Sequence, residues 1–180
     1  MDLIDFDIVN VGNLAPQAYW PVGLGRVKVE ATAEVCRSIH PQIQLQIHSE
    51  RFRRSSVKTL PALKGGEKTP VVFACVDSID TRKLIWESLH ERIGFFADGR
   101  MSAEIVRVLA SDQPGVDRHY VTTLFSNSQA YAGSCTAKST VYAAGIAAGL
   151  MLCQFTRWLR GLPVDQDVLV NLLSMELAVA

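Results

Sequence analysis

The sequence predicts an α/β fold in which a mainly parallel sheet is flanked by helices, and three observations lead to it. Segments with the two-residue period of strands alternate with segments that have the 3.6-residue period of helices. The short apolar run Val71–Cys75 is typical of a parallel strand that is buried on both faces. Finally, 180 residues, 48% hydrophobic and 20% charged, are enough for a folded core. We expect residues 1–180 to form a single domain.

Strand and helix patterns succeed each other in the first part of the chain. Leu3–Val11 is rich in Ile and Val, which predicts a strand. After a loop containing Pro and Gly, apolar residues recur at every fourth position from Val27 to Ile39, which predicts an amphipathic helix. Ile43–Ile47 alternates as a second strand. Six Lys or Arg lie in the stretch 49–69, which we expect to be an exposed connection.

The same alternation continues after the strand predicted at Val71–Cys75. Asp77-Ser78 can cap a helix that continues to about Arg92. A long helix crowded with small residues is predicted at Thr136–Arg160. Further strands are predicted at Gly94–Ala97, Ile105–Leu109 and Tyr120–Phe125, and a terminal strand or hairpin at Val168–Val170 and Leu177–Val179.

Charge and composition exclude several classes of protein. Eighteen basic and eighteen acidic residues give a net charge of zero, so we expect no nucleic-acid partner. The first residues carry acids where a signal peptide needs bases, so we expect a cytoplasmic protein. The most apolar stretch, Val141–Phe155, is shorter than the roughly 20 residues that cross a bilayer, so we expect no membrane association. The four widely spaced cysteines lack the spacing of a zinc site and are expected to be reduced thiols.

Polar residues cluster near the ends of the predicted strands, where ligands bind in open α/β sheets. These residues are Asp5, Asp7, Asn13, Asp77 and Asp98. Capping and turn formation would explain any one of them alone. Their joint occurrence at strand ends predicts a ligand site.

Several of these residues belong to longer motifs. The chain contains Leu3-Ile4-Asp5-Phe6-Asp7-Ile8-Val9, then Asn13-Leu14 and Gln17, then Gly25-Arg26-Val27-Lys28-Val29-Glu30, then His40-Pro41-Gln42-Ile43, and later Cys75-Val76-Asp77-Ser78 with Arg82. Together they resemble the ThiF/MoeB/HesA superfamily, whose members activate ubiquitin-like proteins and sulfur carriers. The resemblance extends from Leu3 to Gly161 and implies a Rossmann-like, ThiF-like fold.

The resemblance implies ATP- and Mg²⁺-dependent adenylation of the C-terminal Gly-Gly carboxylate of a ubiquitin-like or sulfur-carrier protein. Such a transfer depends mainly on positioning and charge stabilisation. In the family pattern, Asp5 holds the ribose, Lys28 the phosphates and Asp77 the metal. The implied catalytic residues are Lys28, Asp77 and Cys135, and the implied ATP-binding residues are Asp5, Asp7, Asn13, Gln17 and Arg82.

The chain departs from the family pattern at two places. Pro16 stands where the family has a loop arginine, and Pro can neither carry charge nor donate from its backbone. The first strand and its glycine-rich loop are also missing from the expected order, so we expect a homodimer or a partner subunit. Three functions therefore stay open: an adenylating enzyme, a non-catalytic relative that binds a protein partner, and a nicotinamide-dependent oxidoreductase. The third is weakest, because the chain lacks the glycine fingerprint.

Overall fold

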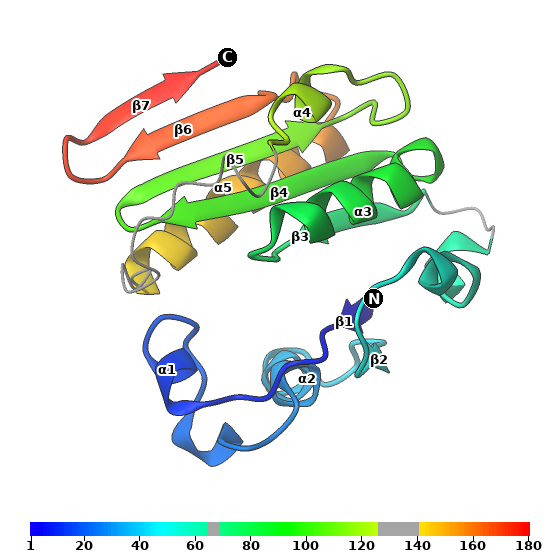
Figure 1. Ribbon diagram of the computed structural model, residues 1–180, viewed down its shortest axis with the longest axis vertical. Helices are drawn as coiled ribbons and strands as arrows, with labels where there is room; N and C mark the ends of the chain where they lie inside the picture. The colour runs from blue at the N-terminus through cyan, green and yellow to red at the C-terminus, as the bar shows by residue number, and fades with distance from the viewer. Residues whose placement is uncertain (65–68, 126–140) are drawn as a thin grey trace. The chain divides into compact units, whose positions relative to one another are not determined.

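The computed structural model describes residues 1–64, 69–125 and 141–180. The chain divides into two compact units, Met1–Gly66 and Glu67–Ala180 (Figure 1). Each unit has its own sheet. The single domain expected from the sequence stays a prediction.

The first unit contains a two-stranded parallel sheet and one long helix. Strand β1 (Asp2–Ile4) pairs with β2 (Gln46–His48), and both contact helix α2 (Lys28–Ile39). The short elements are α1 (Val11–Leu14), η1 (Pro21–Gly23), η2 (Arg54–Lys58) and η3 (Pro61–Leu63). The predicted helix is confirmed. The first predicted strand is shorter than expected, because β1 ends at Ile4 and only an isolated bridge joins Ile8 to Val27.

The second unit contains a five-stranded sheet in the order β3-β4-β5-β6-β7. Its strands are β3 (Val71–Ala74), β4 (Phe95–Ser102), β5 (Ile105–Ser111), β6 (Asp167–Asn171) and β7 (Glu176–Val179). The predicted α/β class is confirmed. Within this sheet, however, only β3 and β4 are parallel, and the remaining pairs are antiparallel.

Short loops explain two of the antiparallel pairs, β4–β5 and β6–β7. Only Ala103 and Glu104 join β4 to β5, and Ala103 has a positive φ of 51°. A two-residue hairpin requires such left-handed backbone, whereas a parallel connection needs a dozen or more residues. Residues 172–175 similarly return the chain from β6 into β7.

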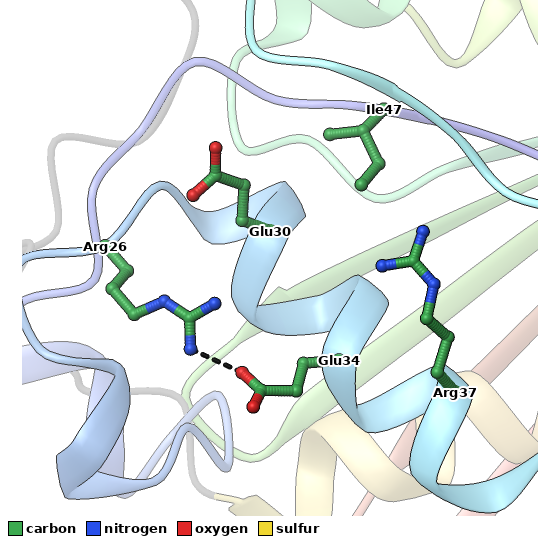
Figure 2. Close-up of a pocket in the computed structure, with 5 residues that line it drawn as sticks. All are labelled: Arg26, Glu30, Glu34, Arg37 and Ile47. Carbon is green, nitrogen blue, oxygen red and sulfur yellow. Dashed lines mark hydrogen bonds and ion pairs between the residues drawn. The ribbon is translucent and has the colours of Figure 1, made fainter. Parts of the chain in front are cut away.

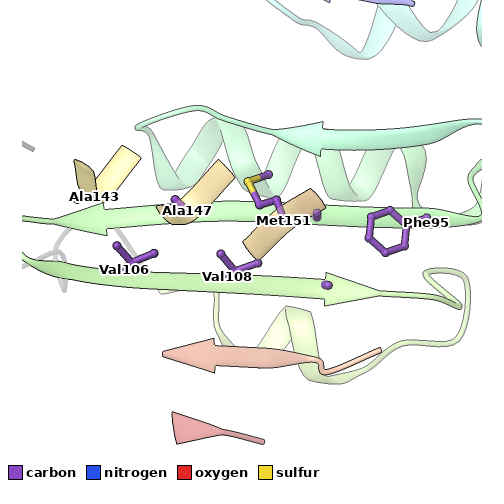
Figure 3. Close-up of a cluster of buried hydrophobic side chains, with 8 residues drawn as sticks. Phe95, Val106, Val108, Ala143, Ala147 and Met151 are labelled. Carbon is purple, nitrogen blue, oxygen red and sulfur yellow. The ribbon is translucent and has the colours of Figure 1, made fainter. Parts of the chain in front are cut away.

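Helices cover both faces of the five-stranded sheet (Figure 1). Helices α3 (Ile79–Leu89), which continues as η4 (His90–Arg92), and α4 (His119–Thr122) lie on one face, and α5 (Val141–Leu159) lies on the other. In Figure 3, Ala143, Ala147 and Met151 of α5 pack on the β4 and β5 side chains that face them. No helix in the described ranges combines the length and the apolar character that a membrane crossing requires.

The strand predicted at Tyr120–Phe125 is wrong, because residues His119–Thr122 form α4. The side chain of Asp117 accepts hydrogen bonds from the backbone N–H groups of His119 and Tyr120, at 2.7 and 3.2 Å, which favours a helical turn. The Tyr120 ring then packs against Trp86, with 4.4 Å between centroids. Local capping and tertiary packing therefore override the β-propensity of this segment.

Alanine substitutions at two glycines are expected to change the stability of the protein in opposite directions. A Cβ on Gly99 of β4 would lie 2.7 Å from the sulfur of buried Met151, so Gly99→Ala should destabilise the protein by about 1–3 kcal/mol. A Cβ on Gly145 of α5 would meet nothing within 4 Å, so Gly145→Ala should stabilise it by up to about 1 kcal/mol. Urea denaturation measures both changes, and an equal effect of the two substitutions would contradict this packing.

Candidate functional site

Asp5, Asp7 and Lys28 come together in the first unit. The Lys28 ammonium is 3.1 Å from a carboxylate oxygen of Asp7, and its side chain is only 12% exposed. The backbone N–H of Lys28 donates to the Asp7 carbonyl oxygen at 2.8 Å. The backbone N–H of Asp7 donates to the Asp5 carboxylate, also at 2.8 Å. The segment after β1 and the start of α2 thus place two carboxylates and one ammonium group next to each other.

Asn13 and Gln17 lie on and just after α1. The side-chain oxygen of Asn13 accepts the backbone N–H of Asn10 at 3.0 Å, so this amide closes the first turn of α1. The Gln17 side chain is exposed, and its backbone N–H donates to the Asn13 carbonyl oxygen at 3.1 Å. Gln17 is therefore accessible to a ligand, whereas Asn13 is engaged in local structure.

A pocket of about 420 Å³ lies beside α2 (Figure 2). It is lined by Arg26, Glu30, Glu34, Arg37 and Ile47. Arg26 forms an ion pair with Glu34, and two arginines against two glutamates leave no excess charge. None of the residues predicted to bind ATP lines the pocket, and its balanced charges do not suit a triphosphate.

In the second unit, Asp77 lies just before α3 and Arg82 lies in its first turn. Asp77 is exposed and directly precedes Ser78, whose hydroxyl caps the helix by accepting the Thr81 N–H at 3.3 Å. Arg82 is buried, and burial, together with the charge of Arg100, lowers its pKa to about 10. The charge of Asp77 acts on the pKa of Arg82 in the opposite direction. Asp77 therefore lies within the electrostatic reach of this guanidinium.

A buried cluster surrounds Asp98, which the sequence pattern places near a strand end but which lies inside β4, because that strand continues to Ser102. The Asp98 carboxylate is fully buried and accepts hydrogen bonds from Arg82, from Arg100 Nε at 2.8 Å and from the Tyr120 hydroxyl at 3.0 Å. Burial raises the pKa of Tyr120 and lowers that of Arg100. We call Arg82, Asp98, Arg100 and Tyr120 the Asp98 cluster. Sequence reasoning missed Arg100 and Tyr120, although the charged residues at alternate positions of the apolar strand β4 signal buried partners.

A second charged group lies on β5, β6 and α4. Arg107 holds the Asp167 carboxylate through two hydrogen bonds of 2.9 and 2.5 Å, and His119 Nε2 lies 3.2 Å from the same carboxylate. The hydrogen bonds from Arg107, aided by His119, hold the pKa of Asp167 below its ordinary value. The sequence contains no local signal for this group, because its members are up to 60 residues apart.

The described residues limit how a metal could bind. No group of three or more His, Cys, Asp or Glu in residues 1–64, 69–125 and 141–180 could hold a metal ion. Mg²⁺ can bind to a protein through a single carboxylate when phosphate oxygens and water complete its coordination. The Asp77 carboxylate fits that role. Cys135, predicted to be a catalytic thiol, lies in 126–140, outside the described residues.

Comparison with known proteins points to one family. The model of the ThiF family matches residues 1–178. Ubiquitin-like modifier-activating enzyme 5 of Drosophila ananassae is 28% identical over 107 residues, which is 54% of this chain and 26% of that enzyme. The Xenopus laevis enzyme of the same name is 28% identical over 96 residues, 49% of this chain and 24% of that enzyme. The matched region is thus about a quarter of these relatives.

Solved structures agree on the fold. PaaA superposes with a TM-score of 0.75 at 14% identity, and the match covers 99% of this chain and 55% of PaaA. Escherichia coli MccB crystallised with ATP superposes with a TM-score of 0.68 at 11% identity, again covering 99% of this chain and 55% of that protein. At such low identity the likeness concerns the fold, and the chain spans about half of each of these proteins.

Asp167 is expected to make the stability of the protein depend on acid pH. A carboxylate with a lowered pKa stabilises the folded state above its unfolded pKa of about 4, and this stabilisation is lost as the pH falls through the folded pKa. Asp167→Asn should therefore lower the free energy of unfolding at pH 7 by about 1.5–3 kcal/mol. The difference from the wild type should shrink below about pH 4. Urea titrations between pH 3 and pH 7, with exposed Asp112→Asn as the control, measure this, and a gap independent of pH would contradict it.

Proposed function

Because the chain belongs to the ThiF family, we propose that it takes part in ATP-dependent adenylation of the C-terminal carboxylate of a ubiquitin-like or sulfur-carrier protein. The observation that carries this proposal is the match of the family model to residues 1–178. The names of the relatives support the class of substrate, since both are ubiquitin-like modifier-activating enzymes.

The Asp5–Asp7–Lys28 group suits part of this chemistry. Asp5 would bind ribose hydroxyls, since its carboxylate is held in place by the Asp7 N–H. Lys28 would bind phosphate oxygens, and its pairing with Asp7 keeps the ammonium in one position. The same pairing offsets part of the positive charge, so phosphate must compete with Asp7 for Lys28.

Asp77 and Cys135 complete the proposed assignment. Mg²⁺, when bound, would neutralise charge on the phosphates, and Asp77 would contribute one carboxylate oxygen to it. Arg82 would keep the start of α3 in place beside Asp77. Cys135, which lies outside the described residues, would be the thiol that captures the activated acyl group, as the family resemblance implies.

The second candidate is a non-catalytic relative that keeps the fold and binds the tail of a ubiquitin-like protein. Two observations favour it: Pro16 replaces the loop arginine, and Lys28 is paired with Asp7. Exchange of labelled pyrophosphate into ATP, with Mg²⁺ and a panel of ubiquitin-like proteins ending in Gly-Gly, separates the two candidates. Exchange that depends on one carrier supports the enzyme, whereas carrier binding without exchange supports the second candidate.

ATP binding by this chain alone is expected to be weak or undetectable. Lys28 is the main cation available to phosphates in the predicted site, and Asp7 already holds it. Calorimetry with Mg-ATP measures the affinity. Tight binding that Lys28→Ala abolishes and Lys83→Ala preserves would contradict the expectation, because Lys83 is 61% exposed and lies in the other unit.

The protein is expected to form a homodimer. Among the described residues, β7 is one of the two edge strands of its sheet. Leu177 on this strand is 65% exposed, and an open edge of this kind favours pairing with another chain. Light scattering should give about twice the 19.8 kDa of the chain. Leu177→Lys should lower the measured mass, while Val116→Lys, at a position that is 73% exposed and outside the strands, should not. A 19.8 kDa species at high concentration would count against dimerisation.

A further inference from the structure

The Asp98 cluster joins both elements that lie on one face of the five-stranded sheet. Its central carboxylate belongs to β4 and has no exposed surface. Arg82 reaches it from α3, and Tyr120 reaches it from α4. Arg82 also donates to the Gly99 carbonyl oxygen at 3.3 and 3.2 Å, so its guanidinium is held by both side chain and backbone of β4.

On the α3 side, the cluster holds the first turn of the helix. The backbone N–H of Arg82 donates to the carbonyl oxygen of Ser78, the capping residue, at 3.0 Å. Asp77 is the residue directly before this cap. A contact that anchors Arg82 on β4 therefore also sets the position from which Asp77 projects.

On the α4 side, the cluster holds the last turn of a short helix. Arg100 donates to the Thr123 carbonyl oxygen at 2.9 Å and to its hydroxyl at 3.1 Å, while its Nε is bound to Asp98. Tyr120 donates directly to Asp98. An α-helix of four residues is not stable by itself, so these contacts help to keep α4 formed, together with the Asp117 side chain and the packing on Trp86.

Charge gives Asp98 a second effect on Asp77. The cluster contains two guanidinium groups and one carboxylate, so removal of that carboxylate would leave two buried guanidinium groups without the counter-ion that they share. The charge of Asp77 already acts on the Arg82 guanidinium. With Asp98 present, Arg82 has an ion-pair partner on β4, so Asp77 is not its only nearby carboxylate.

We propose that Asp98 is a positioning residue that sets Asp77 for divalent-cation binding and ties this position to α4. The divalent-cation role of Asp77 rests on the proposed function. The joint anchoring of α3 and α4 depends only on the hydrogen bonds of the Asp98 cluster. The two parts can therefore be tested separately.

Hydrogen exchange tests the anchoring in the full chain. Asp98→Asn keeps the shape of the side chain and removes its charge, so amides 79–82 and 119–123 should both exchange roughly 10-fold to 100-fold faster, the loss expected for one charged hydrogen bond. Tyr120→Phe removes a single hydrogen bond and should speed exchange in both segments to a smaller extent. The matched control is Asp165→Asn, which breaks contacts of 2.9 Å to Arg157 and 3.1 Å to Gln154 in the same unit and should leave both segments unchanged.

Line broadening by Mn²⁺ tests the effect on Asp77. Trace Mn²⁺ should broaden the amide resonances of Asp77 and Ser78 in the wild type, less in Asp98→Asn, and not in Asp77→Asn. Equal broadening in the wild type and Asp98→Asn would overturn the proposal, as would acceleration of exchange in only one of the two segments in both Asp98→Asn and Tyr120→Phe. Absence of broadening in the wild type would contradict the metal role of Asp77, while the exchange rates would still decide the anchoring.

Discussion

The placement of α3 and α4 in the second unit depends on one buried carboxylate, that of Asp98. Asp98 lies in an apolar strand between Phe96 and Arg100, and an unpaired charge in such a place would cost several kcal/mol. Its partners must therefore come from outside the strand, and they come from α3 and α4. The two helices on this face of the sheet are therefore held by buried ion pairs and hydrogen bonds as well as by packing. On the opposite face, α5 packs through apolar side chains, and its polar contacts, such as Arg157 with Asp165, lie away from that apolar core.

Elements with a clear period could be predicted from the sequence. The regular spacing in α2 and the apolar run of β3 led to elements that the structure confirms within a few residues. Strand direction was not predictable in this way, because it is set by loop geometry such as the left-handed backbone at Ala103. The strand predicted at Tyr120 is wrong for a similar reason. This aromatic residue has strong β-propensity, but the Asp117 side chain and the Trp86 ring hold it in a helical turn.

The residues of the candidate site likewise divide into those that the sequence indicates and those that it does not. Asp7 and Lys28 carry recognisable motifs, and their ion pair brings together residues 21 positions apart. Arg107 and Asp167 carry no motif, and their pairing follows only from the register of β5 and β6. Patterns in a single sequence report local periodicity, whereas long-range ion pairs are decided by which strands become neighbours. The alternation of charge in β4 is the one local sign that buried partners are required.

The unequal burial of the methionines has a practical consequence for oxidation. Met175, in the loop between β6 and β7, is 83% exposed, whereas Met151 in the core of α5 is 4% exposed. Conversion of Met175 to the sulfoxide would add polarity where the side chain already meets water, but the same conversion at Met151 would place a polar group against β4. Mild peroxide treatment followed by peptide mass analysis would therefore report on the packing of α5. Oxidation of Met175 would occur in the folded protein, whereas a sulfoxide on Met151 would mark molecules in which α5 has separated from the sheet.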